Sequence, residues 1–205
     1  GALDPSVQSA GARVHNNLVA FTNQGLAIWH HWSGTKFTDL AIYNNTFVDN
    51  GVQLSGYTGA LPRSELAYNI FLSLSEGTKD VGSTKVTDLM ARNNYFSQGD
   101  PGGGLRHGGN RFEGVQIARM KDWRKVDDPS EVRWQDFAPT QLSVTNGNGI
   151  AAAAFAAAKP ASPVADEHLD FNATPHNDPP DMGALRWRLP AKTPAAPSGV
   201  GARGK

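Results

Sequence analysis

The stretch IWHHWSG, which starts at Ile28, holds the residues best suited to chemistry, because two histidines stand between two tryptophans. Successive side chains of a strand point to opposite faces. If Ile28 points inward, Trp29 and His31 point outward, and His30 faces the core or marks a bend. Exposed aromatic rings stack on sugars, and a histidine can act as acid, base or hydrogen-bond donor. The alternative is structural: Trp29 and Trp32 cover the side of the fold, and the histidines bond locally.

Two later segments add candidates to the same face. Gln53 and Tyr57 belong to the next predicted strand, and the segment GALPRSE (59–65), predicted to be a loop, supplies Arg63 and Glu65. We therefore take His30, His31, Arg63 and Glu65 as catalytic candidates, and the aromatic and amide residues as contacts to substrate.

A third segment, GLRHGGN (104–110), places Arg106 and His107 within a glycine-rich stretch. Mobile loops of this kind often carry function, and both residues are candidates for substrate binding. The alternative is a flexible excursion of the surface.

Two reaction types fit these residues. A lyase acting on uronic acids needs a cation for the sugar carboxylate and a base for the C5 proton, and the candidates are Arg63, Lys79, Lys85, Arg106 and His107. A glycoside hydrolase needs two carboxylates at a set separation. No spacing singles out a pair among Asp39, Asp49, Glu65, Glu76 and Asp80, most of which are expected to be solvated turn residues.

The composition excludes several classes of site and partner. The chain has 205 residues, no net charge and no cysteine, so a nucleic-acid partner, a disulfide framework and a cysteine zinc site are not expected. No H-E-x-x-H motif is present, and no apolar run approaches the roughly 20 residues that span a bilayer. We expect no cofactor; Ca²⁺ in acidic turns stays open, although the nonapeptide Ca²⁺ repeat is absent.

The elements that must position these residues follow from an internal repeat. The motif asparagine, any residue, apolar residue recurs with Asn17, Asn45, Asn69 and Asn94, at spacings of 45−17 = 28, 69−45 = 24 and 94−69 = 25. A strand-like segment precedes each motif, and a glycine turn with a further strand follows at least two of them. Short strands and turns at this period predict a parallel β-solenoid, whose repeats bury their apolar faces only by stacking. The alternative is a β-sandwich with strands every 8–12 residues.

The asparagines have a physical role in this arrangement. Asparagine tolerates left-handed backbone geometry at a sharp corner, and its amide can bond the equivalent amide in the repeats before and after it. The repeat IYNNTFVDNG then consists of a corner at Asn44–Asn45, a strand at Thr46–Val48 and a turn at Asp49–Gly51.

These repeats resemble the coils of right-handed parallel β-helix proteins, the pectate-lyase-like superfamily. The segment SPVADEHLDFNATPHNDPPDMGA (162–184) and the upstream segment KDWRKVDDPSEVRWQDF (121–137) resemble the terminal signature of bacterial members. The resemblance implies a right-handed helix whose substrate groove is lined by the strands GLAI (25–28) and GVQL (51–54). It also implies that this chain, with about four coils, corresponds to the C-terminal portion of a longer solenoid.

Three regions are predicted. Residues 1–114 form the β-helix coils, 115–187 form a capping region of the same domain with a short alanine-rich helix within 149–160, and 188–205 form a disordered tail. Segment 97–114 is predicted to be a loop because of its glycine content.

The resemblance implies a secreted or periplasmic, bacterial-type polysaccharide-acting protein of the lyase or glycoside hydrolase type. Its partners would be a polysaccharide and the preceding N-terminal coils. The alternative is a non-catalytic solenoid: an adhesin, a fibre segment or a carbohydrate-binding module.

Overall fold

The computed structural model describes residues 8–28, 36–56, 59–82, 86–99, 106–108 and 132–138. Within these ranges the chain is almost entirely β, with one short 3-10 helix, and its strands are parallel as the repeat spacing predicted. No helix in the described ranges is long and apolar enough to cross a membrane.

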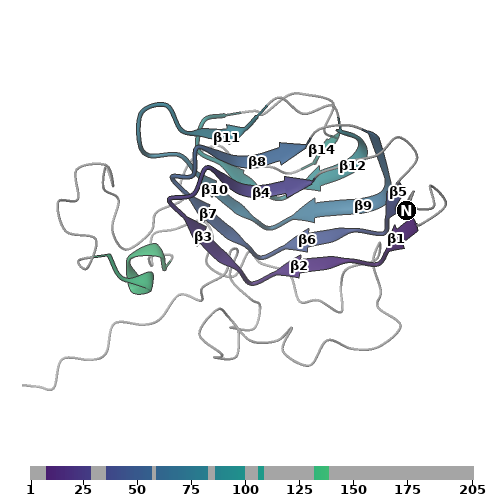
Figure 1. Cartoon of the computed structure of the whole chain (residues 1–205), viewed down its shortest axis with the longest axis horizontal. Helices are drawn as coiled ribbons and strands as arrows, with labels where there is room; N and C mark the ends of the chain where they lie inside the picture. The colour runs from purple at the N-terminus through teal and green to yellow at the C-terminus, as the bar shows by residue number, and fades with distance from the viewer. Residues whose placement is uncertain are drawn as a thin grey trace, which may run out of the picture.

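The strands gather in parallel sheets that are stacked repeat upon repeat (Figure 1). Every strand pairing in the described ranges is parallel. The five-stranded sheet contains β2 (Arg13–His15), β6 (Ala41–Tyr43), β9 (Gly59–Ala67), β12 (Val86–Arg92) and β14 (Arg106–Gly108). The four-stranded sheet contains β3 (Leu18–Ala20), β7 (Thr46–Val48), β10 (Ile70–Leu72) and β13 (Tyr95–Phe96), and the three-stranded sheet contains β4 (Gln24–Ile28), β8 (Val52–Gly56) and β11 (Lys79–Val81). A two-stranded sheet pairs β1 (Gln8–Ala10) with β5 (Lys36–Thr38).

Each of the first three repeats supplies one strand to each of the three larger sheets. Equivalent residues of successive repeats therefore stand beside one another, as in the pairing of Val19 with Phe47 and of Phe47 with Phe71. The glycine of the repeated G-apolar-x-apolar motif is required by close packing between repeats, because a Cβ on Gly51 would lie 2.8 Å from the carbonyl oxygen of Asn23.

The interior is held together by a column of aromatic rings. Phe47 stacks on Phe71 with ring centroids 5.2 Å apart, and Phe71 stacks on Phe96 at 4.9 Å, with interplanar angles of 4° and 6°. Aromatic pairs contribute about 0.5–1.5 kcal/mol beyond the area they bury. Because each ring needs its neighbour in the next repeat, no repeat can bury its core alone.

Two corners bound the strands of the five-stranded sheet, and both have left-handed backbone geometry. The asparagine corner follows these strands. Its first residue has a φ of 54° at Asn16, 52° at Asn44, 57° at Tyr68 and 53° at Asn93, with spacings of 44−16 = 28, 68−44 = 24 and 93−68 = 25. Tyr68 stands where the other repeats have asparagine, and a bulky residue rarely adopts this geometry.

The second residue of the asparagine corner forms the predicted ladder. The Oδ1 of Asn45 accepts hydrogen bonds from the backbone N (3.0 Å) and the Nδ2 (2.9 Å) of Asn17. Asn69 accepts the same pair from Asn45, and Asn94 accepts it from Asn69, each at 3.0 and 2.9 Å. The two roles foreseen for one asparagine are thus divided between neighbours: one bends the backbone, and the next connects the repeats.

The charged corner lies at the other end of these strands. Its left-handed residues are Gly11, Asp39, Arg63 and Asp88, with spacings of 39−11 = 28, 63−39 = 24 and 88−63 = 25. The charged corner therefore repeats in phase with the asparagine corner, although its side chains differ.

The outer face of the four-stranded sheet is apolar and is covered by a distant segment. The segment 132–138, which contains the 3-10 helix η3 (Trp134–Phe137), places Phe137 against Val48, Ile70 and Leu72. Phe137 is 3% exposed and also contacts the ring of Phe21, with centroids 6.0 Å apart. Of the predicted capping region, only this segment lies within the described ranges; the alanine-rich helix and the tail lie outside them.

Two predicted loops contain strands instead. GALPRSE lies within β9, in which Arg63 supplies a left-handed turn so that the strand continues around the charged corner. The segment 97–114 contains β14, which pairs with β12 in register Met90 with Arg106 and Ala91 with His107. Glycine content alone was therefore a poor guide, since the pairing partner β12 fixes the backbone.

Candidate functional site

The three-stranded sheet carries the segments with the most reactive sequence. Strands β4 and β8 pair in parallel with Ile28 opposite Gly56. In sequence, Trp29 follows Ile28 directly, and Tyr57 follows Gly56 directly. The last described residues before the two candidate segments, Ile28 and Gly56, are therefore paired in the sheet.

Five predicted site residues fall outside the described ranges: Trp29, His30, His31, Trp32 and Tyr57. For Arg106 and His107 the structure gives the backbone, in β14, and their pairing partners in β12. The roles assigned to these seven residues stay predictions.

Gln53 lies inside the fold, whereas the sequence analysis predicted that it faces the substrate groove. It is 0% exposed, and its amide contacts the side chain of Asn50 and lies 3.2 Å from the Ser73 hydroxyl. Three consecutive residues of β8, Gln53, Leu54 and Ser55, are buried, so the simple two-residue alternation of a strand does not hold here. At this position the Gln53 side chain makes contacts within a corner of the fold and is not accessible to a glycan.

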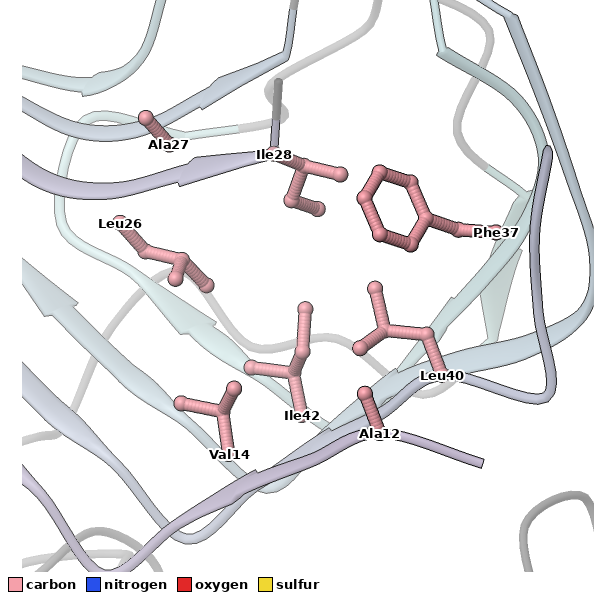
Figure 2. A pocket seen from close by; sticks show the side chains of 8 residues that line it. All are labelled: Ala12, Val14, Leu26, Ala27, Ile28, Phe37, Leu40 and Ile42. Atoms are coloured by element: carbon pink, nitrogen blue, oxygen red, sulfur yellow. The ribbon is translucent and has the colours of Figure 1, made fainter. Parts of the chain in front are cut away.

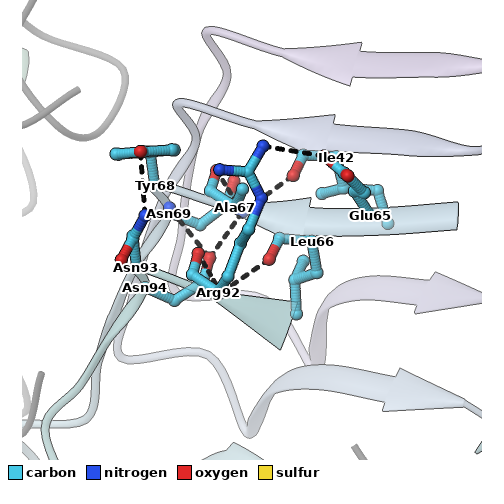
Figure 3. A network of polar contacts seen from close by, with 9 residues as sticks. All are labelled: Ile42, Glu65, Leu66, Ala67, Tyr68, Asn69, Arg92, Asn93 and Asn94. Carbon is cyan, nitrogen blue, oxygen red and sulfur yellow. Dashed lines mark hydrogen bonds and ion pairs between the residues drawn. The ribbon is translucent and has the colours of Figure 1, made fainter. Parts of the chain in front are cut away.

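Glu65 forms an ion pair with Arg92 of the following repeat (Figure 3). Its carboxylate Oε2 lies 3.0 Å from Nη2 of Arg92, and the Glu65 side chain is 11% exposed. The Arg92 guanidinium also lies over the ring of Tyr68, 5.7 Å from its centroid, and Asn93 donates a hydrogen bond to the Tyr68 hydroxyl at 2.8 Å. These contacts help to hold Tyr68 in its left-handed conformation, and they commit the Glu65 carboxylate to a cation.

Arg63 makes a second ion pair, at the charged corner. Its Nε lies 2.6 Å from Oδ1 of Asp39 and its Nη2 lies 2.7 Å from Oδ2, a bidentate geometry. The hydrogen bond from Arg63, with a second from Thr38, lowers the pKa of Asp39 below its ordinary value. The Arg63 side chain is 66% exposed, so solvent screens this pair strongly.

Two further carboxylates are buried between the four- and three-stranded sheets. Asp80 accepts hydrogen bonds from the hydroxyls of Ser73 (2.7 Å) and Ser97 (3.0 Å) and from the backbone N of Gln98 (2.7 Å). Burial raises the pKa of Asp80, and these hydrogen bonds oppose the rise. Asp49 accepts from the backbone N (2.9 Å) and the hydroxyl (2.8 Å) of Ser75.

The carboxylates available for hydrolysis are thus largely used by the fold. Asp39 and Glu65 are paired with arginines, and Asp49 and Asp80 accept hydrogen bonds that close turns. Glu76 is exposed. Within the described ranges no three histidine, aspartate or glutamate side chains gather where they could hold a metal ion.

An apolar cavity of about 230 Å³ lies inside the first two repeats (Figure 2). Its lining includes Val14, Leu26, Ile28, Phe37 and Ile42. A sugar needs polar groups that fix its hydroxyls, and this lining has no polar side chain, so the cavity does not suit a glycan.

Sequence reasoning missed Asp39 and Arg92 as partners of the candidate residues, although a signal existed. Arg63 lies 24 residues after Asp39, and Arg92 lies 27 residues after Glu65, so each pair joins successive repeats. Applying the repeat spacing of 24 to charged residues would have found the Asp39–Arg63 pair. It would not have found Arg92, which lies two residues beyond Met90, the strand partner of Glu65.

No protein-family model, curated protein or solved structure matches this chain. The stacked parallel strands are compatible with a β-helix, and membership of the pectate-lyase-like superfamily stays a prediction from resemblance.

Proposed function

We propose that this chain is part of a right-handed parallel β-helix that binds an extended polysaccharide at the edge where β4 and β8 end. The observation that carries the proposal is the pairing of Ile28 with Gly56, because Trp29 and Tyr57 follow these two paired residues directly in the sequence. Aromatic residues that follow two paired strands in the sequence would suit the repeating rings of a glycan. The protein would act outside the cytoplasm, in a secreted or periplasmic setting, where such polymers occur.

Three features support the β-helix. The repeats contribute strands in the same order to the same sheets, all pairings in the described ranges are parallel, and the asparagines and phenylalanines stack in columns. Right-handedness follows from the strong general preference of parallel strand crossovers.

For catalysis, we propose lyase chemistry rather than hydrolysis. A hydrolase would need two carboxylates facing one sugar, and four of the five candidates serve the fold. His30 and His31 are left as the bases beside the proposed binding edge, with cations from Arg106 or His107. The same engagement of carboxylates supports the second function, a non-catalytic carbohydrate-binding module, adhesin or fibre segment.

The test is binding to a panel of uronate-containing and neutral polysaccharides. Trp29→Ala, Trp32→Ala and Tyr57→Ala should each weaken binding by roughly tenfold, about 1.4 kcal/mol per lost ring contact. Phe21→Ala is the matched control, because Phe21 is an exposed aromatic residue on a different part of the chain. Unchanged binding in all three variants, or no binding of the wild type to any polymer, would refute the proposal.

A second measurement separates lyase from module. Absorbance of the unsaturated uronate product would report elimination, and new reducing ends without that absorbance would report hydrolysis. In the lyase case His30→Ala or His31→Ala should abolish the absorbance while polymer binding is retained. A glycan that binds and stays intact would identify the module.

A further inference from the structure

The apolar cavity of the first two repeats is surrounded by side chains that converge on one space (Figure 2). Val14 lies in β2, Leu26 and Ile28 in β4, Phe37 in β5 and Ile42 in β6. Every side chain of the lining is a hydrocarbon, and the volume is about 230 Å³. A ligand that needs a hydrogen bond or an opposite charge from a side chain would find no partner here.

The cavity arises from small residues in the first repeat. Ala12 stands where the second repeat has Leu40, and Val14 stands where it has Ile42, each 28 residues later (40−12 = 28, 42−14 = 28). Val14 and Ile42 are paired in the sheet, and Ala41 donates its backbone N to the carbonyl of Ala12. The backbones of the two repeats are therefore in register here, and the first repeat places fewer side-chain carbon atoms in the shared interior.

The two sides of the cavity differ in their exposure to solvent. On the side of the second repeat, Leu40 and Ile42 are 7% and 0% exposed. On the side of the first repeat, Ala12 is exposed and Val14 is only partly buried. Core residues therefore close the cavity on one side, and on the other side a ligand can approach past the small side chain of Ala12.

Water is a poor occupant of this space. A buried water makes about two to four hydrogen bonds, and the lining side chains offer none. Apolar cavities of about 150 Å³ stay dry and take up benzene. The larger volume here has room for an aromatic ring with a short alkyl substituent, and its entry is favourable because apolar surface of both the ligand and the lining leaves water.

We propose that this cavity is a binding site for a small apolar molecule of the alkylbenzene class. The ligand enters past Ala12 and packs against the Phe37 ring and the buried Ile42 side chain. The proposal goes beyond polysaccharide binding and does not depend on it, because no residue proposed to contact the glycan lines the cavity.

The test uses toluene as the probe and phenol as its matched control, because the phenol hydroxyl would find no polar side chain in the lining. Each is titrated into the full wild-type chain, and NMR measures the methyl chemical shifts and the NOEs from the ligand ring. A double variant, Ala12→Leu with Val14→Ile, fills the cavity with the residues that the second repeat has at the same positions. Its matched control is Val52→Ile, which adds the same methylene to a partly buried valine outside the lining.

In the wild type we expect saturable binding of toluene with a Kd of about 0.1–1 mM and NOEs to the methyl groups of Val14, Leu26 and Ile42. Phenol should bind at least about tenfold more weakly, because its hydroxyl loses water without gaining a partner. Toluene at about ten times its Kd should raise the Tm by about 3–5 °C. The double variant should bind toluene at least about tenfold more weakly and, without ligand, unfold at the same or a higher temperature than the wild type. Val52→Ile should bind toluene like the wild type.

Three binding results would overturn the proposal: no saturable binding, equal affinity for toluene and phenol, or unchanged affinity in the double variant. NOEs in the ligand-free protein between the lining methyl groups and another segment would also overturn it, because the chain itself would then fill the space. If those NOEs depended on protein concentration, the occupant would be a second copy. If the double variant does not fold, the NOEs from toluene to the wild type decide the question. Polysaccharide binding is not a readout, so failure of the glycan assay and failure of this proposal are told apart.

Discussion

The asparagine corner and the charged corner bound the same strands and repeat in phase, yet they join their repeats differently. At the asparagine corner Asn45, Asn69 and Asn94 are 0% exposed, and each amide bonds the next. At the charged corner the Arg63 side chain is 66% exposed and pairs with Asp39 alone in the contacts described. A left-handed bend in the backbone thus needs no particular side chain; burial decides whether a self-complementary amide is required, since only the exposed corner can use water.

The largest loss of stability is expected for Asn69→Ala, in the asparagine corner. The change removes the acceptor of Asn45 and the donor to the carbonyls of Ile42 and Ala67, all in the buried interior. We expect a loss of about 3 kcal/mol in the free energy of unfolding, because buried polar groups lose their partners. Urea denaturation measures the loss.

The matched control is Asn17→Ala at the exposed end of the same ladder. Asn17 is exposed, so water can replace its contacts, and we expect a loss of about 1 kcal/mol. Equal losses in the two variants would mean that burial does not set the energy of the ladder.

The buried carboxylate of Asp80 gives a second test of the energy of buried polar groups, through the pH dependence of the free energy of unfolding. Its folded pKa is raised above the ordinary value of 3.8 by burial, so the folded protein binds the proton more tightly than the unfolded chain does. The stability linked to this proton is present below pH 3.8 and is lost as pH rises through the folded pKa. We expect a smaller effect than in Asn69→Ala, because three hydrogen bonds oppose the burial.

Unfolding free energies measured across the acidic range test this expectation. Asp80→Asn should remove this falling component, since the amide does not titrate. If the variant and the wild type show the same slope, Asp80 titrates normally in the folded protein.

The smallest effect is expected at the charged corner. Arg63→Ala should leave the unfolding midpoint close to that of the wild type, because the ion pair is exposed and screened. The pKa of Asp39 should rise toward its ordinary value, since Arg63 is the main cause of its depression. NMR titration of the Asp39 carboxyl carbon measures this rise. A loss of stability as large as that of Asn69→Ala would remove the distinction between the two corners.

The spacing of asparagines was enough to predict much of the fold. It predicted parallel strands at Thr46–Val48, the left-handed corner and the stacked amides, because a repeated residue at a fixed period implies the same environment in each repeat. It did not predict β14, although the triplet asparagine, arginine, phenylalanine at 110–112, two residues after Gly108, repeats the motif in sequence.

The candidate site was less predictable, because side-chain direction depends on geometry that composition does not contain. Gln53 turned inward since the alternation of β8 fails beside its corner. The partners of Arg63 and Glu65 lie in adjacent repeats. Applying the period to charges finds Asp39, 24 residues before Arg63, but Arg92 is offset by two residues from Met90, the strand partner of Glu65.

The packing of Phe137 on the four-stranded sheet has a practical consequence for cutting the chain. A truncation after Gly108 would keep every described strand but would strip the cover from Val48, Ile70 and Leu72. That apolar strip, laid bare to water, would draw molecules together and make the shortened protein precipitate. A cloning boundary for the stack therefore belongs beyond Ala138, even though the last described strand ends thirty residues earlier (138−108 = 30).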